Sequence, residues 1–174
     1  MDKIITLFFS IKGQTIGPHM KIVNQEKGNC QIVAEYIQEE TQCDLFEIKA
    51  DKEYSKDHMT LIKEAKLELK KDILVPVKDY VDDFDAYNKV FLVYPNWWNT
   101  IPMVLKTFLK HYDWNGKTII PVCTNEGSGL GESVSDIKKY ALHASVEEGV
   151  SFIGSQVKDQ EEAIKEWIHA EVKA

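Results

Sequence analysis

The chain has 174 residues, of which 44% are hydrophobic, and this size and composition predict one globular domain spanning residues 1–174. The net charge of −7 argues against a nucleic-acid partner, which requires a clustered basic face, and no apolar run is long enough to cross a bilayer. The three cysteines are scattered, the five histidines lack metal-ligand spacing, and the first apolar stretch does not resemble a signal peptide. We therefore expect a cytoplasmic protein without a disulfide framework, a metal site or a membrane contact.

Apolar stretches and helical patterns alternate along the chain. Residues 4–9 predict a buried strand, residues 10–27 a long loop rich in Gly, Pro and polar residues, and residues 29–40 an amphipathic helix. The pattern then predicts, in order, a strand at 44–48, a helix at 57–71, a surface connection at 72–88, a strand at 89–94, a helix at 102–110, a strand at 117–123, a helix at 133–140, a strand at 145–152 and a helix at 159–172.

Polar residues ahead of three predicted helices are candidate N-caps. Thr100 precedes the helix that begins near Pro102, Ser133 or Ser135 would cap the next helix, and Asp159 would cap the last. One apolar stripe of the last helix is predicted to belong to the core, and it consists of Ala163, Ile164, Trp167 and Ile168.

Five strands that alternate with helices predict an α/β fold, a parallel sheet covered on both faces in three α/β/α layers. For five strands the doubly wound order 2-1-3-4-5 is favoured, with a crevice between the first and third strands. Pro121 inside the fourth strand weakens that part of the prediction, because proline lacks the N–H that a ladder uses. The order would bring three loops to one mouth, those that begin at Ser10, Pro95 and Thr124.

The first of these loops ends at Gly28-Asn29-Cys30, where the first helix begins. Free backbone N–H groups and the helix dipole make such a helix start an anion site. Ser10 would add a hydroxyl and Lys12 a charge. The alternative is an ordinary turn before a helix, in which none of these groups binds a ligand.

The second loop carries Trp97 and Trp98 at the carboxyl end of a buried strand, which is where open α/β sheets bind ligands. The two indoles are either a platform for a flat ring, or packing groups of which one lies under the loop and the other caps the sheet. The residues alone do not favour one reading over the other.

The third loop, residues 124–131, contains glycines at 127, 129 and 131. Their spacing differs from the G-x-G-x-x-G dinucleotide fingerprint, which also belongs to the first strand–helix turn. A better use is a backbone edge that offers N–H groups to a planar ring, with hydroxyls from Thr124 and Ser128. In the alternative reading the glycines only allow the turn.

Two longer motifs resemble a known family. Residues 94–103, Tyr-Pro-Asn-Trp-Trp-Asn-Thr-Ile-Pro-Met, resemble the Tyr-Pro-x-Trp-Trp-Gly-Thr-x-Pro-Met motif of the bacterial flavodoxin-like flavoproteins. Residues 119–131 resemble that family's strand-four motif, Pro-x-Cys-Thr-x-x-Gly-Ser-Gly, and Phe8-Phe9-Ser10 with the later Gly-Asn is similar to its phosphate loop. The resemblance covers nearly the whole chain and implies a flavodoxin-like fold that binds FMN non-covalently.

The resemblance implies that the three loops hold the cofactor, with the indoles beside the flavin ring and the backbone N–H groups of residues 125–129 at its pyrimidine edge. No side chain is expected to act as a general base, because the flavin supplies the chemistry. The implied cofactor-binding residues are Ser10, Lys12, Gly28, Asn29, Cys30, Pro95, Asn96, Trp97, Trp98, Asn99, Thr100, Thr124, Asn125, Glu126, Gly127, Ser128 and Gly129.

The chain departs from the family's pattern in three places. The short phosphate loop of the family, Ser-x-Thr-Gly-Asn-Thr, is matched partly by residues 10–15 and partly by residues 27–30, with an insertion between them. We favour Ser10 with residues 28–30 as the phosphate contacts, and Gln14 with Thr15 is the alternative. Cys30 replaces a threonine, and a thiol at a helix start is expected to have a lowered pKa. Asn99 replaces a glycine, which is expected to change the local backbone path.

Two redox functions follow from the resemblance. We slightly favour an FMN-dependent oxidoreductase, in which NAD(P)H would be the donor, a small quinone-like or nitro compound the acceptor, and a homodimer a common assembly. The other function is that of a flavodoxin, an electron carrier that meets a redox partner protein and turns over no substrate. The stretch 11–27 would favour the enzyme if it walls the ring or extends an interface. A non-redox binding module, with Trp97 and Trp98 holding a peptide or nucleobase, is a further alternative.

Overall fold

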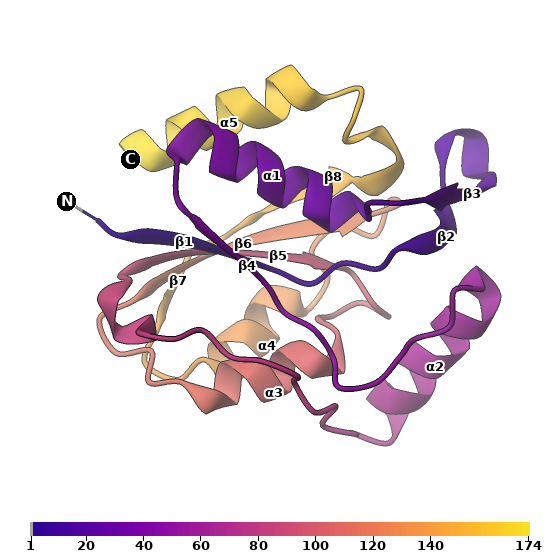
Figure 1. Ribbon diagram of the computed structural model, residues 1–174, viewed down its shortest axis with the longest axis horizontal. Coiled ribbons are helices and arrows are strands. Elements are labelled where there is room, and N and C mark those ends of the chain that lie inside the picture. Colours follow the sequence, from indigo (N-terminus) through magenta and orange to yellow (C-terminus); the bar gives the residue numbers. More distant parts are fainter. Residues whose placement is uncertain (1) are drawn as a thin grey trace.

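The computed structural model describes residues 2–174, and within that range a parallel six-stranded sheet is the centre of the molecule (Figure 1). Its order is β4 (Asp44–Glu47), β1 (Ile4–Phe8), β5 (Lys89–Pro95), β6 (Thr118–Asn125) and β7 (Ser145–Val146), and β8 (Val150–Ile153) also pairs with β6. This confirms the predicted order 2-1-3-4-5, with the fifth strand divided into β7 and β8.

The division of the fifth strand accommodates Pro121. β6 pairs with β7 at Thr118 and Ile119 and with β8 from Val122 onward, so Pro121 lies in the gap between the two ladders. Gly149 turns the chain there with a φ of 78°, and a Cβ on it would lie 2.8 Å from the Pro121 carbonyl oxygen. A strand can contain proline where no N–H is required of it, and this gap is such a place.

Helices cover both faces of the sheet. α1 (Asn29–Thr41) and α5 (Glu161–Lys173) lie on one face, and α3 (Met103–His111) and α4 (Ser133–Tyr140) on the other (Figure 1). Successive residues of β5 point to opposite layers, as expected for a strand buried on both sides. Val90, Leu92 and Tyr94 pack in the core under α3 and α4, while Phe91 and Val93 pack under α1 and α5.

The stretch 10–27, predicted as a loop, is instead largely an antiparallel hairpin. β2 (Gly13–Ile16) pairs with β3 (Ile22–Gln25), and the turn between them holds the short 3-10 helix η1 (Pro18–Met20). The prediction was wrong because each strand has only four residues, none of them fully buried, so no long apolar run marks them. The β-branched residues of the two strands were the signal that could have shown them.

The hairpin is joined to α2 (His58–Lys70), and both lie at the same end of the molecule in Figure 1. The backbone N–H of Gln14 donates to the carbonyl oxygen of Lys56 at 3.2 Å, and the N–H of His58 donates to Gln14 Oε1 at 3.1 Å. Asp57 caps α2 by accepting from the backbone N–H of Thr60 at 2.8 Å. The hairpin and the start of α2 therefore form one hydrogen-bonded unit.

The three predicted N-caps are wrong. α3, α4 and α5 follow Pro102, Glu132 and Gln160, and none of these helices has a side-chain cap. The hydroxyl of Thr100 donates a hydrogen bond to the carboxylate of Asp136. The hydroxyl of Ser133, the first residue of α4, forms a hydrogen bond of 2.8 Å with the hydroxyl of Tyr94. Neither Ser135 nor Asp159 caps a helix. The hydroxyls of Thr100 and Ser133, predicted from the local pattern to cap helices, instead form hydrogen bonds with side chains that are distant in the sequence.

The apolar stripe of α5 is confirmed only in part. Ile164 and Ile168 are fully buried, whereas Ala163 is exposed. Trp167 is partly buried and packs edge-on against Phe152, with ring centroids 5.7 Å apart.

Residues 72–88 are more than a surface connection. Val75, Phe84 and Tyr87 are buried in the core on the α3 side, and a short 3-10 helix, η2 (Phe84–Ala86), precedes β5. The buried ammonium of Lys117 donates to the carbonyl oxygens of Phe84 and Tyr87, at 3.2 and 2.5 Å.

Among residues 2–174, no helix has both the length and the apolar character that crossing a membrane requires.

Candidate functional site

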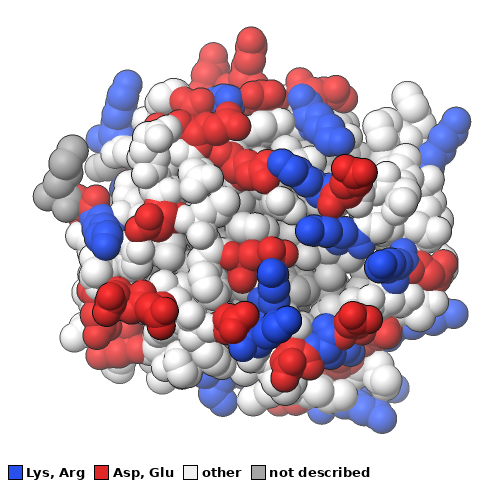
Figure 2. All heavy atoms as spheres, viewed as in Figure 1, with Lys and Arg blue, Asp and Glu red and all other residues white. Residues whose placement is uncertain are grey.

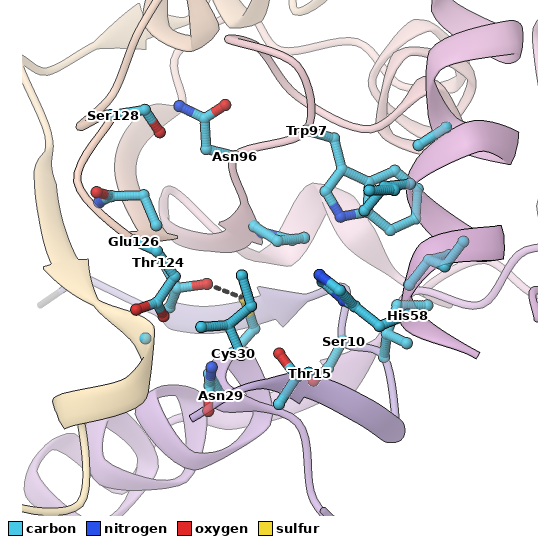
Figure 3. A pocket seen from close by; sticks show the side chains of 18 of the residues that line it. Ser10, Thr15, Asn29, Cys30, His58, Asn96, Trp97, Thr124, Glu126 and Ser128 are labelled. Atoms are coloured by element: carbon cyan, nitrogen blue, oxygen red, sulfur yellow. Dashed lines mark hydrogen bonds between the residues drawn. The ribbon is translucent and has the colours of Figure 1, made fainter. Parts of the chain in front are cut away.

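A cavity of about 460 Å³ lies at the carboxyl ends of β1, β5 and β6, between α1, α2 and the β2–β3 hairpin (Figure 3). This is the edge of an open parallel sheet at which ligands bind. The volume falls within the range of small-molecule and cofactor sites. The topology therefore places the cavity where the sequence predicts that three loops meet.

One end of the cavity is the start of α1. Gly28 is the residue before the helix, and the first helical bond runs from the N–H of Ile32 to the carbonyl oxygen of Gly28. The preceding N–H groups have no partner within the helix, and the first turn of α1 holds neither an acidic residue nor a side-chain cap. Ser10 Oγ accepts from the N–H of Gln31 at 3.3 Å. This helix start can bind an anion.

Gly28 itself is needed for close packing. A Cβ at this position would lie 2.1 Å from Ser10 Oγ and 2.4 Å from the carbonyl oxygen of Ile11. The chain that leaves β1 and the chain that enters α1 therefore touch across Gly28. Gly28 shapes the site from behind rather than lining it.

Cys30 forms part of the cavity floor with Thr124, and its Sγ lies 3.1 Å from Thr124 Oγ1 (Figure 3). Burial raises the pKa of the Cys30 thiol to about 12, and the hydrogen bond to Thr124 opposes that shift only in part. The expected lowering of this pKa was wrong, because desolvation of the thiolate outweighs the favourable helix start. The thiol is a buried structural group.

The tryptophan loop is a tight turn with two residues in the left-handed region. Trp98 has a φ of 54° and Asn99 a φ of 73°, and the N–H of Trp97 donates to the carbonyl oxygen of Thr100 at 2.9 Å. Asn96 Oδ1 accepts from the N–H of Asn99 at 2.8 Å. Asparagine is among the few residues that adopt this conformation readily, so Asn99 fits a position at which the family pattern has glycine.

The two indoles have different surroundings. Trp97 is partly buried and packs edge-on against Phe9 and Tyr54, with ring centroids 5.3 and 5.2 Å apart. Trp98 is 44% exposed and its indole N–H donates to the carbonyl oxygen of Ile62 on α2 at 2.9 Å. Both rings line the cavity, and Trp98 lies against α2 rather than capping the sheet.

The glycine-rich loop folds around Asn125. Its Oδ1 accepts from the N–H groups of Gly127 and Gly129 at 2.8 and 3.0 Å, and its Nδ2 donates to the carbonyl oxygen of Phe152. Two of the backbone N–H groups expected to face a ring are therefore used within the loop. The edge of the cavity is formed here by Glu126 and Ser128.

Glu126 carries the one carboxylate that lines the cavity within residues 2–174. Its two oxygens accept from the N–H and the hydroxyl of Ser155, each at 2.7 Å. Gly154 is also close, because a Cβ there would lie 2.6 Å from Asn29 Nδ2 and 2.9 Å from Glu126 Oε1. The carboxylate is therefore held at the end of β8 by its own donors.

The structure brings eleven of the seventeen predicted residues to the cavity wall and leaves six outside it. Those on the wall are Ser10, Asn29, Cys30, Pro95, Asn96, Trp97, Trp98, Thr124, Asn125, Glu126 and Ser128. Those outside the wall are Lys12, Gly28, Asn99, Thr100, Gly127 and Gly129. Apart from Lys12, the other five shape the loops through the turn, close packing and hydrogen bonds described above.

The sequence left open whether residues 11–27 wall the site, and it missed the wall formed by α2. Gln14 and Thr15, the alternative phosphate contacts, do line the cavity. The cavity residues that the sequence prediction did not name are Ile11, Ile16, His58, Leu61, Ile62, Ala65 and Gly154. The sequence predicts the helix at 57–71, but nothing local indicates that one of its faces lines a cavity.

The charges around the cavity are unevenly placed. No lysine lines it within residues 2–174, and the chain contains no arginine. On the face shown in Figure 2, lysines concentrate on the side where the hairpin and α2 lie in Figure 1. Among the described residues, no group of three or more His, Cys, Asp or Glu side chains is placed to hold a metal ion.

Comparisons with known proteins agree with this architecture. A family model described as flavodoxin matches residues 22–171, whereas no curated protein matches the chain. A structure described as a flavoprotein from Bacteroides eggerthii DSM 20697 is 23% identical, covers 98% of both chains and gives a TM-score of 0.72. A flavoprotein from Lactobacillus acidophilus NCFM, solved in complex with FMN, is 18% identical over 91% of this chain and 98% of that chain, with a TM-score of 0.64.

Oxidised flavodoxin 1 from Bacillus cereus is 14% identical, covers 98% of this chain and 97% of its own, and gives a TM-score of 0.56. At these identities the structures establish the shared fold, and the family model establishes the family. The chain belongs to the flavodoxin family.

Proposed function

We propose that this protein binds FMN non-covalently and transfers electrons or hydride through it. The observation that carries the proposal is the cavity that joins the open start of α1 to Trp97 and Trp98. A phosphate requires donors at one end of a site and a flat ring requires apolar faces at the other, and the cavity has this polarity. The Lactobacillus acidophilus flavoprotein, which shares the fold, was solved with FMN.

The polar end of the cavity suits a phosphate although it lacks a lysine side chain. Asn29 and Cys30 present backbone N–H groups at the start of a 13-residue helix, and Ser10 and Thr15 add hydroxyls. The helix dipole favours an anion at this end. The carboxylate of Glu126 is engaged by Ser155, which limits its repulsion of a bound phosphate.

The apolar end suits a planar ring. Trp97 is fixed by its edge contacts with Phe9 and Tyr54, and Leu61 and Ile62 of α2 continue the wall. When bound, FMN would supply the electron-transfer chemistry, and this chain would hold the ring and exclude water from it. The net charge of −7 would disfavour extra negative charge on the ring and would attract a basic partner protein.

One observation favours an FMN-dependent reductase over an electron carrier that turns over no substrate. Gln14, Thr15 and Ile16 of β2 line the cavity, so the inserted hairpin walls the site instead of extending away from it. A walled site can admit a small acceptor and hold it beside the ring. NAD(P)H would then be the electron donor, and a redox partner protein would replace it in a pure carrier.

The proposal is tested with the purified protein reconstituted with FMN and dialysed. Retained flavin absorbance supports FMN binding, and a colourless protein contradicts it. Anaerobic stopped-flow reduction with NADH and NADPH then distinguishes the two forms. Rapid bleaching by either nucleotide favours the reductase, whereas reduction only through an added reductase protein favours the carrier.

A further inference from the structure

Among the titratable side chains that line the cavity, His58 is the one whose polar atoms are neither deeply buried nor hydrogen-bonded to another residue. Three titratable residues line it among residues 2–174, namely Cys30, His58 and Glu126. Burial raises the pKa of the Cys30 thiol to about 12, and both oxygens of Glu126 accept hydrogen bonds from Ser155. The backbone N–H of His58 donates to Gln14 Oε1, and within residues 2–174 its ring nitrogens have no hydrogen-bond partner.

The imidazole is partly buried and enters the cavity from the α2 side, across from Glu126 and Ser128 (Figure 3). Histidine is the side chain that exchanges a proton most readily between pH 5 and 8. Hydride transfer from a flavin to a carbonyl compound leaves an oxygen that needs a proton, so a proton donor beside the ring has a defined use.

The wall around His58 is largely apolar, and Gln14 and Thr15 of β2 add polar groups to it. Ile11 and Ile16 approach from the hairpin side, and Leu61, Ile62 and Ala65 form the inner face of α2. A largely apolar wall with an imidazole that can donate a hydrogen bond suits a small flat molecule that presents a carbonyl oxygen to that imidazole. A quinone has this chemistry, since it is planar and accepts two electrons and two protons.

On the basis of the proposed function, we propose that His58 protonates a small quinone as the quinone takes a hydride from reduced FMN. The hydride carries two electrons and one proton, and the imidazolium N–H supplies the second proton. The quinone leaves as hydroquinone, FMN is reoxidised, and the neutral imidazole recovers its proton from water. His58 is thus a catalytic residue of the oxidative half-reaction.

The kinetic test compares two acceptors. Wild-type and His58→Asn holoproteins are reduced with stoichiometric dithionite and mixed anaerobically with menadione or with ferricyanide, which takes electrons without protons. The substitution is expected to slow quinone reduction about 100-fold, within the range of general acid catalysis, and to leave ferricyanide reduction unchanged. Added imidazole is expected to restore part of the quinone rate.

The matched control is His19→Asn. His19 lies in η1 at the tip of the same inserted hairpin, is exposed and does not line the cavity. The His19→Asn holoprotein is expected to reduce both menadione and ferricyanide at the wild-type rates. His58→Gln is measured in parallel because its longer side chain preserves more of the volume of the imidazole.

A binding measurement provides a readout apart from turnover. Coumarin is planar, carries a carbonyl oxygen and is not reduced by the flavin, so its affinity for oxidised holoprotein can be titrated through the flavin spectrum. His58→Asn is expected to weaken binding several-fold, which is the loss of one hydrogen bond. The imidazole NMR signals of His58 are expected to shift with coumarin in the wild type, while those of His19 stay unchanged.

The outcomes separate this proposal from the proposed function. A wild-type protein that retains no FMN contradicts both. Holoproteins in which His58→Asn reduces menadione as fast as the wild type, or slows both acceptors equally, overturn only the role of His58. Loss of flavin from both His58 variants would make His58 a structural residue and would also overturn it.

Discussion

Cys30 Sγ lies 3.1 Å from Thr124 Oγ1, and this contact joins the start of α1 to the end of β6 beneath the cavity. Both residues are almost fully buried. The two residues are 94 positions apart in the chain. The floor of the site therefore depends on packing between segments that are distant in the sequence.

The Cys30 thiol is expected to be unreactive in the folded protein. With a pKa of about 12, about one thiol in 10⁴ is ionised at pH 8, roughly 10³-fold fewer than for an unburied thiol. Labelling with a thiol-specific disulfide reagent should therefore be slow in native buffer and complete for all three cysteines in guanidinium chloride. Cys30→Ser identifies the signal of this thiol. Rapid native labelling that Cys30→Ser abolishes would contradict the burial.

The two cavity tryptophans are expected to differ in their effects on stability. Trp97→Ala removes the contacts with Phe9 and Tyr54 and should lower the free energy of unfolding by about 3 kcal/mol. Trp98→Ala, at an exposed position, should change it by less than about 1 kcal/mol. Urea unfolding of the apoprotein measures both values.

Either substitution should also weaken FMN binding, by about tenfold or more, if both rings contact the flavin. Quenching of FMN fluorescence measures the dissociation constant, and the double variant should still fold. Trp167→Phe, at α5 and away from the cavity, is the control. Unchanged FMN affinity in the double variant would remove the proposed role of the indoles.

The turn at Trp98 and Asn99 makes a prediction about the backbone. Because Asn99 has a φ of 73°, Asn99→Ala should cost about 1 kcal/mol, whereas Asn99→Gly should be close to neutral. Thermal unfolding of the two variants measures the difference. Equal stability of the alanine and glycine variants would show that the left-handed conformation is not required in solution.

Those parts of the fold that depend on local pattern could be predicted from the sequence. β1, β5 and β6 are continuous apolar runs because each is buried on both faces, and their order follows from the alternation with helices. The edge of the sheet that carries the cavity follows from that order. Prediction was weaker where a side chain has a distant partner, as Thr100 has in Asp136 and Ser133 has in Tyr94.

The second half of the site could not be predicted for a related reason. Gln14 and His58 are 44 residues apart and meet through one hydrogen bond, and no spacing rule connects them. The four-residue strands of the hairpin are stabilised by pairing with each other and by α2 rather than by burial of one face. A hydrophobic pattern in the sequence indicates which residues are buried. The residues of β2 and β3 are exposed or only partly buried, so the pattern does not mark them.

A carboxylate pair far from the cavity should make stability depend on pH. The hydrogen bond between Glu171 and Glu147 raises the pKa of Glu171 to about 7, and burial and the charge of Glu147 add to the shift, against an opposing effect of Lys89. The folded state therefore holds a proton that the unfolded chain, with a pKa of 4.5, has lost. This contribution is fully present below pH 4.5 and decreases as the pH rises to about 7.

Urea unfolding between pH 4 and 8 measures the effect against Glu171→Gln. The variant cannot lose this proton, so the wild type should lose about 1 kcal/mol more across the window, a value reduced by the partial solvation of the pair. Glu166→Gln, exposed on the same helix, should follow the wild-type curve because its carboxylate lies outside this pair. Parallel curves for the wild type and Glu171→Gln would show that the two carboxyl groups do not share a proton.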